Sequence, residues 1–241
     1  MKNVHFILQG KGGIGKSVIA SWLAQYYQAQ NLPLACIDAD PINTTLLGYK
    51  ALQASHIQLM TGSQLDARRF DEMMERILSE DTHFIVDNGA ASFIPLSNYL
   101  IENQAIDLIA QHHKQVVVHS IITGGQALID TLNGFAQLVE QLPAQVVIIV
   151  WLNAFFGSIV ADGKPFEQMQ TYLKHRHRIS GIIYVAKQSE ETFGKDLACM
   201  LEKKLTFAQI NAHPEFSLMA KQRLAMVKKV LFDQLHFLNL G

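Results

Sequence analysis

Residues 10–17 read G-K-G-G-I-G-K-S, and this short stretch decides the fold. It fits the phosphate-binding pattern G-x-x-x-x-G-K-[ST] in full. An apolar run at residues 4–8 precedes it, and a segment with helical spacing at 17–30 follows it. A strand, a glycine-rich loop and a helix in this order predict a P-loop, in which backbone N–H groups and the helix N-terminus face phosphate oxygens. The alternative is a glycine-rich turn with an incidental lysine, and the complete motif in this context argues against it.

The motif also assigns roles to its polar side chains. Lys16 is expected to bridge the β- and γ-phosphates of a nucleotide, and Ser17 to place its hydroxyl on Mg²⁺. The glycines free the backbone to curl around the phosphates. The residues expected to bind the nucleotide in this stretch are Gly10, Lys11, Gly12, Gly13, Ile14, Gly15, Lys16, Ser17 and Val18.

Apolar runs that read as strands recur along the chain, at residues 4–8, 34–37, 84–86, 116–119, 146–151 and 179–185. They are nearly continuous instead of alternating, which indicates burial on both faces and hence a parallel sheet. Segments with helical spacing lie between them, at residues 17–30, 65–78, 96–110, 127–142 and 165–175. This alternation predicts an open, mostly parallel α/β sheet with helices on both faces. Two later helices, at about 190–203 and 216–238, are expected to pack on it, so that residues 1–241 form a single P-loop domain.

The composition is that of a folded chain without a broad basic surface. Of the 241 residues, 49% are apolar and 17% are charged, which excludes an intrinsically disordered protein. The net charge is −1, with −3 on residues 1–120 and +2 on residues 121–241, so any non-specific DNA contact should be local and in the second half. No apolar run is long enough to predict a membrane-spanning helix. Cys36 and Cys199 fit neither a disulfide framework nor a zinc site, which favours a reducing cytoplasm.

Carboxylates follow two of the predicted strands. The strand at 34–37 runs into Asp38-Ala39-Asp40-Pro41, and the strand at 83–87 reads H-F-I-V-D and ends on Asp87. In an open α/β sheet, ligands bind at the carboxyl ends of the strands. We therefore expect Asp38 near the Mg²⁺ shell, Asp40 to orient an attacking water, and Asp87 to hold Mg²⁺ through water. Turn formation is the alternative role for Asp38 and Asp40, because Asp before Pro is a common turn former.

Lys11 adds a second lysine to the phosphate loop. With it, K-G-G-I-G-K-S resembles the deviant Walker A box of the MinD/ParA group of ATPases. The resemblance implies an ATP-sandwich homodimer, in which Lys11 reaches the phosphates of the nucleotide held by the partner subunit and acts in catalysis with Lys16 and Asp40. It also implies that Asn153, after the strand at 146–151, hydrogen-bonds adenine. One departure stands out, because residues 88–92 read N-G-A-A-S where many relatives continue D-x-P-x-G after the aspartate.

Two longer stretches narrow the resemblance. Residues 38–52 (D-A-D-P-I-N-T-T-L-L-G-Y-K-A-L) and 86–100 (V-D-N-G-A-A-S-F-I-P-L-S-N-Y-L) resemble the TraL and StbB proteins of conjugative plasmids. This implies a role in plasmid transfer or positioning, with slow ATP hydrolysis stimulated by a partner. ATP-dependent dimerisation would switch affinity for a DNA-bound or secretion-machinery protein.

Other readings of the chain stay open at this point. An ATP-dependent biosynthetic ligase of the dethiobiotin synthetase type would share the fold, although such enzymes typically lack a lysine at the position of Lys11. A nucleotide-binding adaptor without turnover would keep the same motifs. The basic run at 174–178 fits a helix end better than a DNA contact, and the apolar positions of the helix at 216–238 fit packing on the sheet better than membrane binding.

Overall fold

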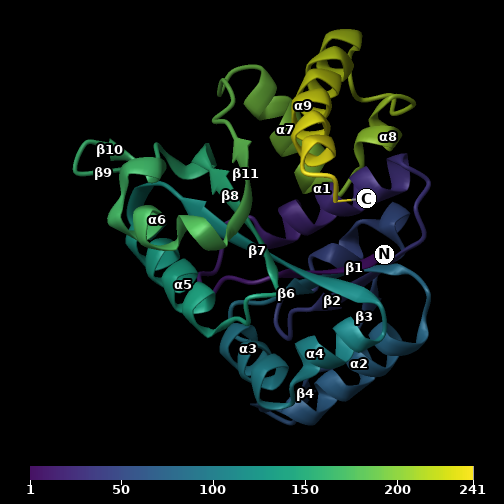
Figure 1. Ribbon diagram of the computed structural model, residues 1–241. Coiled ribbons are helices and arrows are strands. Elements are labelled where there is room, and N and C mark those ends of the chain that lie inside the picture. The colour runs from purple at the N-terminus through teal and green to yellow at the C-terminus, as the bar shows by residue number, and fades with distance from the viewer. Residues whose placement is uncertain (241) are drawn as a thin grey trace.

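The computed structural model describes residues 1–240, and a seven-stranded sheet lies at its centre (Figure 1). The strand order is β11-β8-β7-β1-β6-β2-β3, and every neighbouring pair is parallel. The strands are β1 (Lys2–Ile7), β2 (Leu34–Ala39), β3 (Ser55–His56), β6 (His83–Asn88), β7 (Lys114–Thr123), β8 (Val147–Asn153) and β11 (Ile179–Val185). The predicted fold class is confirmed, and β3 is the one strand of this sheet that was not predicted.

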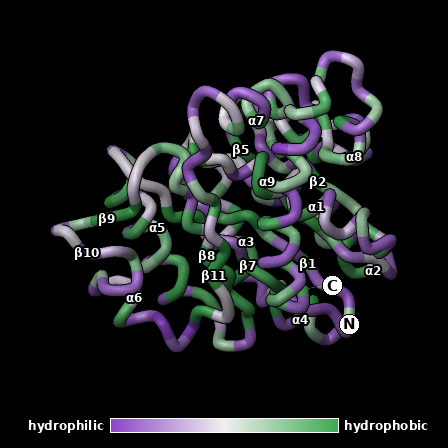
Figure 2. The backbone as a smooth tube through the Cα atoms, turned by 90° about the horizontal axis from the view of Figure 1, so that it is seen from above, coloured by the Kyte–Doolittle hydropathy of each residue, from purple (hydrophilic) through white to green (hydrophobic). Residues whose placement is uncertain are grey.

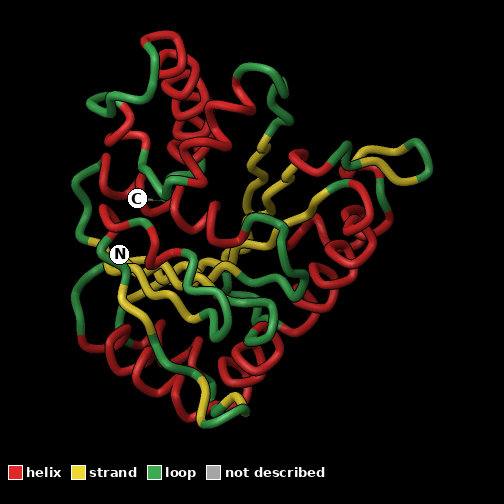
Figure 3. Tube along the Cα trace, turned by 180° about the vertical axis from the view of Figure 1, so that it is seen from behind, coloured by secondary structure: helices red, strands yellow, loops and turns green. Residues whose placement is uncertain are grey.

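Helices cover both faces of the sheet, as Figures 1 and 3 show from opposite sides. On one face lie α1 (Lys16–Ala29), α7 (Phe193–Glu202), α8 (Phe207–Ile210) and α9 (Leu218–Phe237). On the other lie α2 (Phe70–Ser79), α3 (Phe93–Glu102), α4 (Ala105–Gln111) and α5 (Leu128–Gln141), with α6 (Gln170–His175) against α5. Each face therefore has its own hydrophobic core.

The strands are apolar throughout because both of their faces are covered. In β1, Val4 and Phe6 belong to the core under α2–α5, while Ile7 belongs to the core under α1 and α9. All three side chains are fully buried. In Figure 2 the central strands β1, β7 and β8 run through the hydrophobic interior of the molecule. Burial on both faces explains the nearly continuous runs in the sequence.

The region predicted as a helix at 65–78 begins instead with a short hairpin. Strands β4 (Met60–Thr61) and β5 (Gln64–Leu65) pair around Gly62, whose φ of 64° is left-handed. Asp66 then accepts a hydrogen bond from the backbone N–H of Arg68 and starts the next turn. Helix α2 itself begins only at Phe70. The prediction placed the helix start too early because it missed this aspartate cap.

Two other predicted helices also differ. The segment at 96–110 is two helices, α3 and α4, because Gln104 adopts a left-handed φ of 50° between them. The segment at 165–175 contains a 3₁₀ turn, Phe166–Gln168, and the short helix α6 at its end. Before α6, strands β9 (Val160–Ala161) and β10 (Lys164–Pro165) form a hairpin that projects at the left of Figure 1. Neither this hairpin nor α8 was predicted.

A line of buried polar side chains crosses the sheet on the α1 face. Trp151 Nε1 donates to His119 Nδ1 (2.9 Å), His119 Nε2 lies 2.9 Å from His5 Nδ1, and His5 Nε2 lies 2.6 Å from the Tyr27 hydroxyl. The Tyr27 hydroxyl in turn donates to the carbonyl oxygen of Leu240. This line joins β8, β7, β1 and α1 to the end of the described chain, beside β1.

The direction of the hydrogen bonds in this line is fixed by its two ends. Indole N–H can only donate and a carbonyl can only accept, so each imidazole must accept at Nδ1 and donate from Nε2. Both histidines are therefore neutral in the folded protein. Burial lowers the pKa of His119 to about 3 and holds the pKa of His5 well below its usual value.

Candidate nucleotide-binding site

The glycine-rich loop curls between β1 and α1 as a P-loop does. Gly13 and Gly15 have φ values of 73° and 96°, which side chains with a Cβ rarely adopt. Helix α1 begins at Lys16, and neither a side-chain cap nor an acidic residue occupies its first turn. Helix α1 has 14 residues, and the backbone N–H groups of its first turn are therefore free to bind an anion.

Lys16 points back across the loop. Its Nζ donates to the carbonyl oxygen of Lys11 at 2.7 Å, and its side chain is almost fully buried. Burial lowers the pKa of Lys16, while the nearby carboxylates of Asp87 and Asp40 act in the opposite direction. The loop therefore encloses the ammonium group of Lys16. The same group is expected to contact the phosphates that the loop binds.

Asp87 is a buried carboxylate without a hydrogen-bond partner. It lies near the end of β6 with 1% of its surface exposed, and neither oxygen has a partner among residues 1–240. Burial raises its pKa to about 7, an effect that the nearby Ser17 hydroxyl partly offsets. Leaving such a group unpaired in the interior is costly. A cation bound beside it would remove that cost.

These residues fit Mg²⁺ in particular. Mg²⁺ prefers oxygen ligands and usually keeps waters, taking one or two carboxylates together with substrate phosphates. Ser17 and Asp87 supply a hydroxyl and a carboxylate at the phosphate end of the loop. No cluster of three or more His, Cys, Asp or Glu side chains within residues 1–240 is arranged to hold a metal by itself. A magnesium ion here would thus depend on the phosphates of the nucleotide.

Asp38 is engaged differently from Asp87. Its Oδ2 accepts the backbone N–H groups of Leu46 (2.9 Å) and Leu47 (3.2 Å), and its Oδ1 accepts that of Asp40 (3.2 Å). Burial raises the pKa of Asp38, and these three backbone donors only partly offset that rise. In this structure Asp38 therefore organises the loop that follows β2, and any contact with Mg²⁺ would come in addition to that role.

Asp40 belongs to the same loop and faces the end of β6. Its Oδ1 accepts the backbone N–H groups of Ile42 (2.9 Å) and Asn43 (3.1 Å). The carboxylate lies against Gly89, where an added Cβ would be 2.5 Å from Oδ1. Glycine at position 89 thus allows the two loops to approach closely.

Lys11 forms an ion pair with Asp130, a residue that no sequence motif connects to the loop. Its Nζ lies 2.6 Å from Oδ2 of Asp130, at the start of α5, and the two side chains are 44% and 54% exposed. A pair this exposed contributes roughly 0–1 kcal/mol, so a phosphate could displace Asp130 at little cost. Asp130 is 119 positions away in the chain, and only the fold brings it to the loop.

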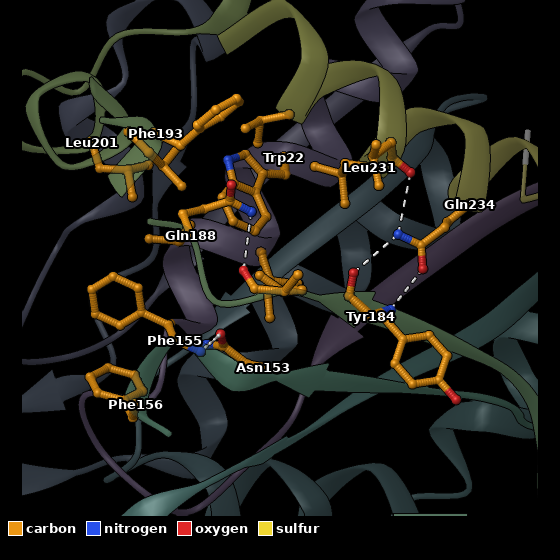
Figure 4. A pocket seen from close by; sticks show the side chains of 18 of the residues that line it. Trp22, Asn153, Phe155, Phe156, Tyr184, Gln188, Phe193, Leu201, Leu231 and Gln234 are labelled. Carbon is orange, nitrogen blue, oxygen red and sulfur yellow. Dashed lines mark hydrogen bonds between the residues drawn. The ribbon is translucent and has the colours of Figure 1, made fainter. Parts of the chain in front are cut away.

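A pocket of about 440 Å³ continues from the outer side of the P-loop (Figure 4). It lies between α1, the loops after β8 and β11, and helices α7 and α9. In Figure 4, Asn153 and Phe155 lie at one end, while Trp22 and Leu231 lie further in. Val18 and Trp22 line it from the same face of α1, four residues apart. The size and the mainly apolar walls suit the base of a nucleotide.

Asn153 lines this pocket but also holds it together. Its Nδ2 donates to the carbonyl oxygen of Ile14 at 3.0 Å, and its Oδ1 accepts the backbone N–H of Phe155 at 3.2 Å. The carboxamide therefore links the P-loop to the loop after β8, and a contact with adenine would use its remaining hydrogen and lone pair. Trp22 was not singled out from the sequence, although its spacing from Val18 on a predicted helix could have indicated it.

The other candidate surfaces have mainly internal contacts. Lys174 pairs with Glu140 at 2.6 Å, and Arg178 donates to the carbonyl oxygen of Pro143 at 2.8 Å, so two cations of the basic run are engaged within the chain. Helix α9 buries Leu224 and other apolar residues against the sheet. Among the described residues, none of the helices combines the length and apolar character needed to cross a bilayer.

Comparison with known proteins places the chain in a family. Two proteins named TraL from Escherichia coli are 45% and 46% identical over 235 residues, covering 98% of this chain and 98% of each relative. MinD from Aquifex aeolicus, in a MinC:MinD cell division complex, has a similar fold with a TM-score of 0.52 and 11% identity, covering 97% of this chain and 96% of MinD. The resemblance found in two segments thus extends along the chain, and a family model matches residues 5–197. The chain belongs to the CobQ/CobB/MinD/ParA nucleotide-binding domain family.

Proposed function

We propose that this protein is an ATP-dependent switch that binds Mg²⁺ and ATP, hydrolyses ATP slowly and dimerises when ATP is bound. The observation that carries the proposal is the unpaired Asp87 carboxylate, buried beside Ser17 and Lys16 in a P-loop. The resemblance to conjugative-plasmid proteins supports a role in plasmid transfer or positioning. A DNA-bound or secretion-machinery protein is the partner that we expect.

The residues of the site have different roles in ATP hydrolysis. The P-loop amides and Lys16 bind the phosphates and stabilise the charge that develops on them, while Asp40 orients the attacking water. Ser17 and Asp87 would hold Mg²⁺, which when bound offsets charge on the phosphate oxygens. Asn153 and the pocket beyond it hold the base. Most of the rate enhancement would come from positioning and electrostatic stabilisation.

Dimerisation is supported by the surface around the site. Three exposed isoleucines stand near site residues: Ile42 (73% exposed) lies in the Asp40 loop, Ile94 (59%) is the second residue of α3, and Ile129 (59%) precedes Asp130. They follow β2, β6 and β7, whose carboxyl ends meet at one edge of the sheet. Exposed apolar side chains gathered at such an edge suit a protein interface. A second copy facing this edge would bring its Lys11 to the bound nucleotide.

Size-exclusion chromatography with ATP, ADP and a non-hydrolysable ATP analogue tests the proposal. The wild type should dimerise with the analogue and remain monomeric with ADP. Asp40→Ala should accumulate dimers with ATP, because without hydrolysis the dimers do not dissociate. Lys11→Ala should stay monomeric with every nucleotide. A wild-type protein that elutes as a monomer in all conditions would rule out the switch. Normal dimerisation and hydrolysis by Lys11→Ala would refute the role of Lys11 in the partner's site.

A further inference from the structure

A buried hydroxyl lies where the loop after β6 meets the end of β2. Ser92 has no exposed surface, and its Oγ lies 2.6 Å from Oδ1 of Asn88 and 3.1 Å from the carbonyl oxygen of Ala39. Ala39 stands directly between Asp38 and Asp40. The hydroxyl has one hydrogen to donate, and the shorter distance assigns that hydrogen to Asn88 Oδ1, with the Ala39 carbonyl oxygen in contact.

A second contact fixes the other side of Asp40. Asn88 is also buried, and its Nδ2 donates to the carbonyl oxygen of Gly89 at 3.0 Å. Gly89 in turn forms the surface against which the Asp40 carboxylate lies, so closely that an added Cβ would be 2.5 Å from Oδ1. Ser92 thus fixes the side chain of Asn88, Asn88 binds the carbonyl oxygen of Gly89, and Gly89 limits the position of Asp40.

We infer that Ser92 and Asn88 are positioning residues for Asp40. The backbone pairing of β2 with β6 ends at Ala39 and Asn88, and beyond it these side-chain hydrogen bonds hold Gly89 against Asp40. This inference rests on the proposed function, in which Asp40 orients the attacking water.

Steady-state ATP hydrolysis by Ser92→Ala tests the inference. The kcat should fall about tenfold or more, because a small displacement of a positioning group lowers the rate of chemistry, while the KM for ATP stays unchanged. Ser97→Ala is the matched control, since Ser97 is a buried serine in α3, the helix that Ser92 precedes, and its hydroxyl has no partner in the described chain. Its kcat should equal that of the wild type. Circular dichroism should first establish that each variant is folded at the assay temperature.

The Asp40→Ala background separates positioning from a general structural effect. If Ser92 acts through Asp40, adding Ser92→Ala to Asp40→Ala should lower kcat no further. Gly89→Ala gives a second route, because it pushes against Asp40 without removing either hydrogen bond, and it too should lower kcat at constant KM. An unchanged kcat in Ser92→Ala and Gly89→Ala, or additive losses with Asp40→Ala, would overturn the inference. Absence of hydrolysis in the wild type would refute the proposed function itself.

Discussion

Replacing His119 with glutamine should flatten the dependence of stability on pH. Glutamine keeps an acceptor for Trp151 and a donor for His5, but it does not titrate. His119 is completely buried, and its pKa is about 3 in the folded protein, compared with about 6.5 for an exposed histidine. The unfolded chain takes up a proton below pH 6.5 whereas the folded chain does not. The stability of the wild type is therefore fully present above pH 6.5 and declines as the pH falls toward 3.

The size of this loss follows from the distance between the assay pH and the unfolded pKa. At pH 5.0 the unfolded histidine is about 1.5 pH units below its pKa, and each unit is worth about 1.36 kcal/mol, so His119 alone should cost about 2 kcal/mol. The figure barely changes if the folded pKa lies a unit higher or lower. Asp87, whose pKa is raised to about 7, acts in the opposite direction on acidification, but it does so equally in both proteins.

Urea unfolding at pH 7.5 and pH 5.0 measures the effect. Between these two pH values the wild type should lose about 2 kcal/mol more unfolding free energy than His119→Gln. His112→Gln, which removes an exposed histidine, should behave like the wild type. Equal pH-dependent losses in the wild type and His119→Gln would mean that His119 is not a neutral member of a one-way line of hydrogen bonds.

Three further substitutions test other parts of the structure. Asp130→Asn should release the first P-loop lysine and strengthen ATP-dependent dimerisation by up to about fivefold in analytical ultracentrifugation, and an unchanged dimer affinity would contradict a competing role for this pair. Asn153→Ala should weaken ATP binding about tenfold in isothermal titration calorimetry, because it unties the P-loop from the pocket, and wild-type affinity would exclude that role. Tyr27→Phe should lower the unfolding free energy by about 2 kcal/mol in urea, while Tyr49→Phe, which removes a buried hydroxyl that has no hydrogen-bond partner among residues 1–240, should cost little; equal losses would contradict the argument.

The parts of the fold that follow from local pattern could be predicted from the sequence. The P-loop has a complete motif and most strands of the sheet have a continuous apolar run, so both can be found in the sequence. Strand β11, for example, was predicted at residues 179–185, where the structure has it. The two-residue strand β3 has no apolar run to mark it. The break between α3 and α4 occurs at a glutamine with left-handed φ, where neither glycine nor proline gives a warning. Such features depend on tertiary packing and not on local propensity.

The candidate site divides in the same way. Lys16, Ser17 and Asp87 could be predicted because each stands in a motif of known spacing, and the structure brings them together. The positions of Asp130 beside Lys11 and of Ser92 beside Ala39 could not, since only the folded sheet creates these contacts. The departure at residues 88–92 was visible in the sequence, but its consequence was not, because Ser92 and Ala39 are 53 positions apart in the chain.

The link that Asn153 makes between Ile14 and Phe155 has a thermodynamic consequence. The loop after β8 also presents Phe155 and Phe156 at the surface, with their rings packed edge to face. A protein that binds these rings and shifts their loop would alter the P-loop, and with it the affinity for the nucleotide. Linkage then requires the nucleotide to change the affinity for that protein by the same factor. The side chain of Asn153 would thus couple two binding events, so that nucleotide binding and protein binding at this surface each change the affinity of the other.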